Sequence, residues 1–271
     1  MHSITASLQK NIEDDLNLNF STEGFVTHLT KLLAGFVVLY FGAGGPALGD
    51  GSAVFACNEF PPYKMEKSAS GLPGFDVEFL KESFRRVGIS VDIQYMPWKR
   101  ALEQARKGQV NGVCSCSRTQ EREEYLYFSS PLGKASSGLF SLIENNYSSL
   151  NTIEEIGSQS VGVIRGYNLL ENLHEAKAKN IYELSNERQG LKMLLKGRLD
   201  FYYSYEAPTR YYLAKQKHSD KIFYKETTLK HYYSCFSKAS EGSEKLLEKF
   251  NAGLALIRND GTYDKILTKY R

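Results

Sequence analysis

One short stretch of the chain, residues 114–133, combines an arginine with several hydroxyl side chains. Arg122 follows Ser115, Ser117 and Thr119, which alternate along the chain. The planar guanidinium of arginine makes two parallel, charge-assisted hydrogen bonds to a carboxylate, and hydroxyl groups are able to add further ones. The competing interpretation is a surface ion pair between Arg122 and its glutamate neighbours, which would contribute only about 0–1 kcal/mol.

The other residues capable of chemistry form no clear catalytic or metal-binding pattern. The sequence shows no convincing pair of carboxylates and no order of residues typical of a Ser-His-Asp triad. Zinc spacing is also missing, because Cys114 and Cys116 have no second close pair and the five histidines are scattered. On one strand these two cysteines share a face and are poorly placed to bond each other. Either can meet Cys57 from a neighbouring strand, and the pairing, including that of Cys235, stays open.

Composition is that of an ordinary globular protein. The 271 residues are 42% hydrophobic and 24% charged, with a formal net charge of +3. This length allows two lobes with separate cores. Basic residues are dispersed among acidic ones, so the chain lacks the basic patch expected of a nucleic-acid-binding protein.

A secretory signal is predicted near the N-terminus. Lys31 is its charged flank, residues 32–43 are an apolar run, and small residues at 47–49 offer a cleavage site. The run is shorter than the roughly 20 residues of a membrane-spanning helix, which favours cleavage over an anchor. Residues 1–30 are acidic and polar, which indicates that translation starts later. We therefore expect a leader over residues 1–52 and export to a compartment where disulfides form.

Strands and helices are expected to alternate, which implies a mainly parallel sheet covered on both faces. The apolar spacing after Asp76 predicts a helix that this residue caps and that Gly88 ends. Asn186 with Gln189 is typical of the start of another helix. Strands are expected at residues 54–57, 90–95, 109–116, 128–142, 158–165, 200–203 and 231–236. The helix that starts near Asn186 is expected to end at Lys196. Further helices are expected at residues 98–107, from residue 169 onward, and at 243–257, before a short terminal helix.

A local repeat suggests that the chain contains two similar α/β lobes. Residues 100–113 and 189–202 share one pattern: a helix, Lys-Gly, a polar residue, an aliphatic residue, Asn or Asp, and a strand. Gly108 and Gly197 occupy equivalent helix ends in the two copies, where a left-handed residue is expected. Such a match can arise by chance, because a helix, glycine and strand often follow one another in α/β proteins.

Nine short motifs follow one another between residues 53 and 271. They are Pro61-Pro62-Tyr63, Gly74-Phe75-Asp76, Trp98, Gly108, Glu121-Arg122, Phe128-Ser129-Ser130-Pro131, Gly162-Val163, Gly197-Arg198-Leu199-Asp200 and Asp260-Gly261-Thr262-Tyr263. In this order the chain resembles the bacterial extracellular solute-binding proteins of family 3, which mostly bind polar amino acids. The resemblance implies a periplasmic binding protein-like fold of class α/β, with two lobes of mixed, mainly parallel sheets joined by two crossing strands. It implies a first lobe of residues 53–135 plus 232–271 and a second lobe of residues 136–231.

The same resemblance implies a ligand site between the lobes. It makes Arg122 the group that binds a ligand carboxylate, and it puts Phe60 and Trp98 where two aromatic rings enclose the ligand. Ordinary core packing is the alternative for both aromatic residues. The other predicted ligand-binding residues are Ser115, Ser117, Thr119, Tyr167, Asn168, Tyr205, Glu206 and Glu59.

The chain departs from the family pattern at the far end of the ligand. Members that bind α-amino acids carry an aspartate shortly after the strand that corresponds to residues 200–203, and it pairs with the ammonium group. By spacing, Tyr205 occupies this place here. Glu206, which follows Tyr205, and Glu59, which precedes Phe60, are the two candidates to replace this aspartate as the counter-charge of the ammonium group. The departure predicts a ligand with a carboxylate but puts an ordinary amino acid in doubt.

The resemblance implies a monomeric protein of the periplasm that closes on a small carboxylate-bearing ligand, an amino acid or a relative, by hinge motion. It would pass the ligand to an ABC-type membrane permease or to a sensor, without catalysis, cofactor, metal or nucleic acid. Two alternatives remain from the same fold. One is a cyclohexadienyl or arogenate dehydratase-like enzyme, and the other is a ligand-sensing module for a membrane receptor.

Overall fold

The computed structural model describes residues 52–147, 150 and 152–270, which belong to one compact unit. The predicted secretory signal and translation start lie outside these residues. Within the described ranges, no helix combines the length and the apolar character needed to cross a membrane.

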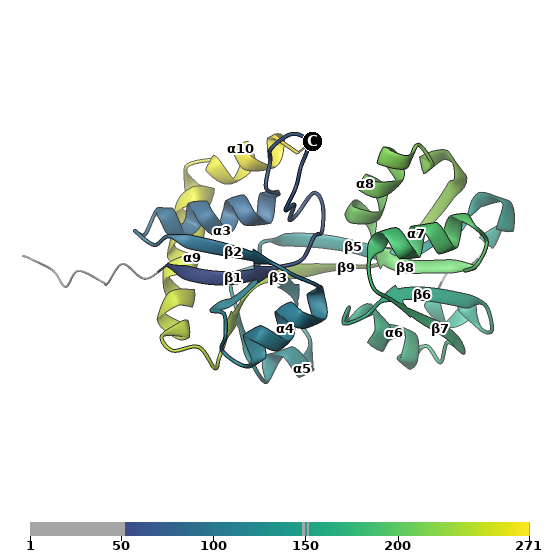
Figure 1. The fold of residues 1–271 in the computed structure, drawn as a ribbon, viewed down its shortest axis with the longest axis horizontal. Helices are drawn as coiled ribbons and strands as arrows, with labels where there is room; N and C mark the ends of the chain where they lie inside the picture. Colours follow the sequence, from purple (N-terminus) through teal and green to yellow (C-terminus); the bar gives the residue numbers. More distant parts are fainter. Residues whose placement is uncertain (1–51, 148–149, 151, 271) are drawn as a thin grey trace, which may run out of the picture. The chain divides into compact units, whose positions relative to one another are not determined.

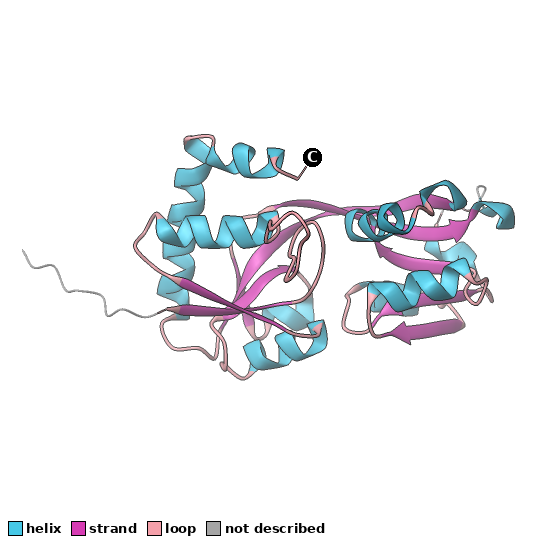
Figure 2. Ribbon diagram, turned by 45° about the horizontal axis from the view of Figure 1, so that its top comes forward, coloured by secondary structure: helices cyan, strands magenta, loops and turns pink. Residues whose placement is uncertain are grey.

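The described residues contain a nine-stranded mixed sheet (Figures 1 and 2). Its order is β2-β1-β3-β9-β5-β8-β6-β7, and β4 also pairs with β9. Pairs within each end of the sheet are parallel, whereas β5 and β9 pair antiparallel to each other and to their neighbours. The strands are β1 Ala53–Cys57, β2 Val91–Tyr95, β3 Gly112–Ser117, β4 Leu126–Phe128, β5 Gly133–Leu142, β6 Ser160–Ile164, β7 Asn180–Leu184, β8 Phe201–Tyr205 and β9 Ile222–Ser237.

Helices cover the sheet in two lobes, and the long strands β5 and β9 pass between them (Figure 1). The first lobe carries α3 Phe75–Arg85, α4 Trp98–Arg106, α5 Gln120–Glu123, α9 Ser243–Asn259 and α10 Thr262–Thr268. The second lobe carries α6 Leu169–Glu175, α7 Glu187–Leu195 and α8 Glu206–Gln216. The prediction of two α/β lobes joined by two crossing strands is confirmed. The predicted lobe boundaries fall inside β5 and β9 and stay a prediction.

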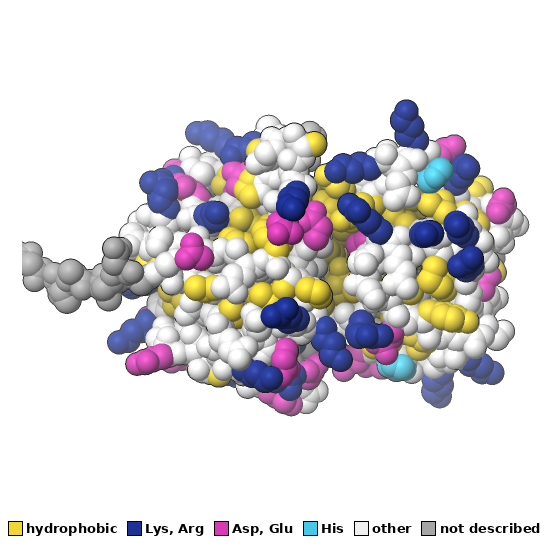
Figure 3. Space-filling model, viewed as in Figure 1, with side chains coloured by type: hydrophobic (Ala, Val, Ile, Leu, Met, Phe, Trp, Pro, Cys, Tyr) yellow, Lys and Arg dark blue, Asp and Glu magenta, His cyan; other side chains and the backbone are white. Residues whose placement is uncertain are grey.

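Several local signals in the sequence have the expected structural effect. Gly108 and Gly197 both adopt the left-handed backbone conformation, with φ of 70° and 62°, at the ends of α4 and α7. The side-chain oxygen of Asn186 accepts a hydrogen bond of 3.0 Å from the Gln189 N–H at the start of α7. On the face shown in Figure 3, Lys and Arg side chains are interspersed with Asp and Glu, as their spread along the chain indicates.

Two expectations about the secondary structure are wrong. Asp76 does not cap α3, which begins after Gly74; its buried carboxylate lies in the first turn and accepts a hydrogen bond from Tyr232 in β9. The predicted strand over residues 128–142 is interrupted at 129–132, so that β4 and β5 are separate. Pro131 lies in this interruption and lacks the N–H that a continuous ladder needs.

The four cysteines form two disulfides. Cys57 in β1 is bonded to Cys114 in β3, and Cys116 in β3 is bonded to Cys235 in β9. Because β3 lies between β1 and β9 in the sheet, its two cysteines bond to opposite neighbours. The disulfides therefore tie three adjacent strands of the first lobe together.

A close helix contact in the first lobe depends on a glycine. Gly253 of α9 packs against α3 so closely that a Cβ atom would lie 1.9 Å from the carbonyl oxygen of Ser83. We expect Gly253→Ala to lower the free energy of unfolding by about 1–3 kcal/mol, because overpacking outweighs the better helix propensity of alanine. Urea unfolding measures the change. Leu256→Ala on the exposed side of the same helix is the control, with a change within about 0.5 kcal/mol. An equal effect of both substitutions would contradict this account.

Candidate functional site

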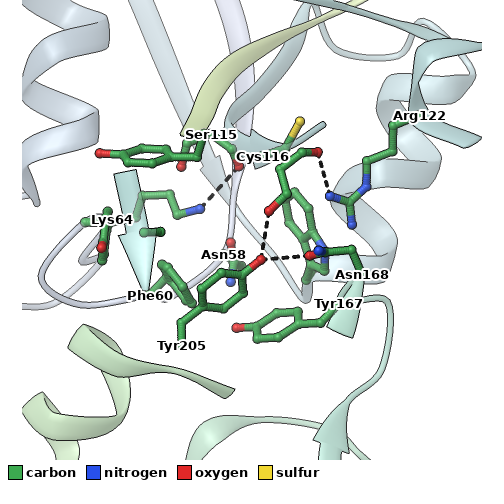
Figure 4. Close-up of a pocket in the computed structure, with 14 residues that line it drawn as sticks. Asn58, Phe60, Lys64, Ser115, Cys116, Arg122, Tyr167, Asn168 and Tyr205 are labelled. Atoms are coloured by element: carbon green, nitrogen blue, oxygen red, sulfur yellow. Dashed lines mark hydrogen bonds between the residues drawn. The ribbon is translucent and has the colours of Figure 1, made fainter. Parts of the chain in front are cut away.

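A small cavity of about 50 Å³ lies between the two lobes (Figure 4). That space corresponds to a few water molecules. Aromatic rings and polar side chains from both lobes and from the crossing strands form its wall. The lining residues are Asn58, Phe60, Tyr63, Lys64, Trp98, Ser115, Cys116, Ser117, Arg122, Ala135, Tyr167, Asn168, Tyr205 and Tyr232.

Arg122 lies in the wall of this cavity and is only 4% exposed. Its guanidinium donates hydrogen bonds to the carbonyl oxygens of Ser117, at 2.9 Å, and Gly166, at 3.0 Å. The short helix α5 fixes its position, because Thr119 caps this helix and accepts the Arg122 N–H at 3.3 Å. The interpretation of Arg122 as part of a surface ion pair is therefore wrong. Two of its glutamate neighbours pair with other arginines, Glu121 with Arg106 and Glu123 with Arg118.

Aromatic side chains of the two lobes meet at the cavity. The Trp98 indole N–H donates a hydrogen bond of 2.9 Å to the Gly166 carbonyl, which also accepts from Arg122. The Phe60 ring lies edge-on to Tyr205 and Tyr167, with ring centroids 5.5 and 6.1 Å apart. One carbonyl of the second lobe thus accepts hydrogen bonds from two side chains of the first.

Tyr205 faces the cavity. Its hydroxyl lies 2.7 Å from the Ser117 Oγ and donates a hydrogen bond of 2.7 Å to the Asn168 side-chain oxygen (Figure 4). Burial raises the pKa of Tyr205, so this hydroxyl stays neutral. The contact joins β3 of the first lobe to β8 and the start of α6 in the second.

Three of the predicted site residues do not line the cavity. Glu206 forms an ion pair with Arg210 one turn later in α8, with 2.7 Å between the carboxylate and the guanidinium. Glu59 is exposed and accepts the Glu66 N–H at 2.8 Å. Thr119 caps α5 instead of facing the cavity. The other predicted site residues, Arg122, Ser115, Ser117, Trp98, Phe60, Tyr167, Asn168 and Tyr205, are all brought together there.

Lys64 is the main site residue that sequence reasoning missed. It is 4% exposed, and its ammonium group lies 3.5 Å from the Ser115 carbonyl oxygen and over the Phe60 and Trp98 rings, at 5.0 and 5.5 Å. Its pKa is lowered to about 8, mainly by burial; the carboxylate of Asp76 partly opposes this shift and the nearby Arg122 adds to it. Its position directly after the Pro61-Pro62-Tyr63 motif could have indicated a site residue. Sequence reasoning passed over it because lysine side chains are normally exposed.

Asp76 and Tyr232 support the same side of the cavity. Tyr232 lines it and donates a hydrogen bond of 3.0 Å to the Asp76 carboxylate. Burial raises the pKa of Asp76 to about 6, although Lys64 and the hydrogen bonds oppose this rise. Within the described part of the chain, no group of three or more His, Cys, Asp or Glu side chains is arranged to hold a metal ion.

The sequence matches a known family over the whole described region. Residues 53–271 fit the model of the bacterial extracellular solute-binding proteins, family 3. The chain belongs to this family. As a member of family 3 it is a solute-binding protein, and the extracellular character of the family supports a location outside the cytoplasm.

Curated relatives of the chain are distant but cover most of it. A probable histidine-binding protein of Neisseria gonorrhoeae is 25% identical over 236 residues, which cover 84% of this chain and 86% of the relative. The histidine-binding periplasmic protein of Escherichia coli K12 is 26% identical over 220 residues, with coverage of 78% and 84%.

Solved structures agree with the fold of family 3. An ancestral arginine-binding protein bound to arginine superposes with a TM-score of 0.71 at 24% identity, and the match covers 81% of this chain and 98% of that one. A histidine kinase sensor domain similar to periplasmic binding proteins has a TM-score of 0.73 at 20% identity, with coverage of 81% and 95%. At these identities the comparison shows the fold alone.

Proposed function

We propose that the protein captures a small carboxylate-bearing solute, an amino acid or a relative, between its lobes and delivers it to an ABC-type permease. The observation that carries this proposal is the buried guanidinium of Arg122 in the wall of the interlobe cavity. Two of its five N–H donors bind carbonyl oxygens, which leaves three for a ligand. The relatives named for binding histidine or other amino acids agree with a ligand of this kind.

Capture would proceed by closure of the two lobes around the crossing strands β5 and β9. In the structure, the lobes contact each other through hydrogen bonds from Arg122 and Trp98 to Gly166 and through the Ser117–Tyr205 pair. Opening the cleft breaks these three contacts and exposes the guanidinium to solvent. Closing restores them after the ligand has entered, and burial then strengthens the charged hydrogen bonds to it.

Binding without catalysis is the second part of the proposal. A dehydratase-like enzyme would need a carboxyl group in the cleft as a general acid. None of the residues that line the described cavity is Asp or Glu. Glu206 lies outside it, and Glu59 lines a neighbouring pocket that shares Asn58, Trp98 and Tyr167 with the cavity. We further propose that the protein acts as an exported monomer in the periplasm.

A thermal-shift screen with amino acids, opines and dicarboxylates tests this function, because a ligand that binds only the native state raises the melting temperature. We expect Arg122→Ala to weaken binding of the best ligand about 10- to 100-fold, since a charged hydrogen bond to the carboxylate is lost. Arg85→Ala is the matched control, because this arginine is exposed on α3 and pairs with Glu82. Unchanged affinity in a folded Arg122→Ala variant would refute the site.

A further inference from the structure

The charge of the cavity wall is unbalanced. Two cationic side chains, Lys64 and Arg122, line the cavity, whereas none of its lining residues in the described chain is acidic. Both cationic groups lie close to the Trp98 ring, with the Lys64 nitrogen 5.5 Å and the Arg122 guanidinium carbon 5.4 Å from its centroid. In Figure 4 they approach the cavity from opposite sides. A ligand in this space therefore meets positive charge at both ends.

Lys64 has no carboxylate partner at contact distance. Among the described residues, no Asp or Glu oxygen forms an ion pair with it within 4.0 Å, and its only protein hydrogen bond is the long one to the Ser115 carbonyl. Asp76 attracts it electrostatically from beyond this distance, and one oxygen of that carboxylate accepts a hydrogen bond from Tyr232. A buried ammonium without a close counter-charge is costly, and an anion at this place would remove much of that cost.

A ligand ammonium group would find few favourable positions in the same cavity. The aromatic faces of Phe60 and Trp98, which suit a cation, already have Lys64 or Arg122 over them. The carbonyl oxygens of Ser115, Ser117 and Gly166 already accept hydrogen bonds from these two cations or from Trp98. Adding a third positive charge would increase the like-charge repulsion.

One buried acceptor of the wall has no protein partner. The side-chain oxygen of Asn58, a residue that is 8% exposed, accepts no hydrogen bond in the structure. Asn58 lines the cavity, so a hydroxyl or amide N–H of the ligand can satisfy this oxygen. A neutral donor serves this purpose without bringing further positive charge.

We propose that the ligand is a small dianion without a free ammonium group, such as a four- or five-carbon dicarboxylate or its hydroxy derivative. One anionic group binds Arg122, as in the proposed function on which this inference rests. The second pairs with the Lys64 ammonium, and a hydroxyl group donates to Asn58.

Calorimetric titration of the dialysed wild-type protein tests the ligand class. Five compounds of the panel share a four-carbon skeleton: butyrate, 2-aminobutyrate, aspartate, succinate and malate. Glutarate and 2-hydroxyglutarate are added as longer dianions. We expect the dianions without an ammonium group to bind at least tenfold more tightly than the other compounds, and malate more tightly than succinate. Equal or tighter binding of aspartate or 2-aminobutyrate overturns the inference and leaves the proposed function intact. If neither this panel nor the broader screen yields any carboxylate ligand, the proposed function itself fails.

Lys64→Met tests the second anion site, because it removes the charge and keeps the length of the side chain. Affinity for the best dianion should fall at least tenfold, whereas affinity for the matching monocarboxylate should stay within twofold. Lys67→Met, at an exposed position of the same segment, is the control and should change neither. An equal loss for both ligands, or no loss for the dianion, contradicts the role of Lys64. The wild-type panel decides the ligand class even if this variant does not fold.

Discussion

Replacing both Cys116 and Cys235 with alanine should lower the free energy of unfolding by about 4–5 kcal/mol. This disulfide joins β3 to β9 across a sequence separation of 119 residues and closes a loop that contains the second lobe. Without it, the unfolded chain gains the conformational freedom of that long loop, and this gain is the main source of the expected loss in the loop-entropy model.

Guanidinium chloride unfolding, followed by the fluorescence of Trp98, measures this loss. The double variant of Cys57 and Cys114 is the comparison, with a separation of 57 residues and an expected loss of about 4 kcal/mol. Mass spectrometry of unreduced peptides should recover the two pairings in the wild type. The prediction fails if full reduction of the wild type leaves its unfolding midpoint unchanged.

Glu187 should make the protein less stable as the pH rises from about 4 to 8. This buried carboxylate accepts hydrogen bonds from Tyr202, Ser204, Tyr167 and Thr209. Burial nevertheless raises its pKa to about 7, against the opposing effect of these hydrogen bonds. In the unfolded chain the pKa of glutamate is about 4.3. The native state therefore holds its proton over a pH range in which the unfolded state has lost it.

The sign of the pH effect follows from this difference. The stabilising contribution of protonated Glu187 is complete below the unfolded pKa and is lost as the pH rises through the native pKa of about 7. A shift of this size corresponds to about 4 kcal/mol in full, at about 1.4 kcal/mol for each unit of pKa, and about 3 kcal/mol of it is lost between pH 4 and pH 8.

Glu187→Gln should remove this component of the pH dependence. Denaturant unfolding of wild type and variant at several pH values measures it, and the difference between the two proteins should change by about 3 kcal/mol from pH 4 to pH 8. Asp76, whose pKa is also raised, acts in the same direction in both proteins and cancels in this difference. Parallel curves for the two proteins would show that the native pKa of Glu187 is not raised above its value in the unfolded chain.

Local patterns suggested the two lobes, and the ordered motifs of the family resemblance predicted how they are joined. The hydrophobic spacing of α3 and α4 and the left-handed glycines Gly108 and Gly197 depend on residues close together in the chain. Such signals can be recognised without tertiary contacts, because backbone conformation and amphipathic spacing are local properties. The motif around Arg122 likewise indicated the centre of the site before its surroundings were known.

Interactions over long sequence distances were not predictable in the same way. The Asp76 expectation relied on local capping, whereas its hydrogen-bond partner, Tyr232, is 156 positions away in β9. The choice of Cys114 for Cys57 and of Cys116 for Cys235 depends on β3 lying between β1 and β9. Glu206 had a local partner, Arg210, one turn later in α8, and this ion pair keeps its carboxylate outside the cavity.

By itself the sequence determined the alternating α/β lobes, the family and an arginine suited to a carboxylate, because these are carried by local spacing and ordered motifs. Only the tertiary structure decided the charge of the cavity. Lys64, Trp98 and Arg122 come from separate segments, and their burial depends on how the strands and the two lobes pack together. Burial of a lysine is costly and follows from the surrounding packing rather than from its neighbours in the chain.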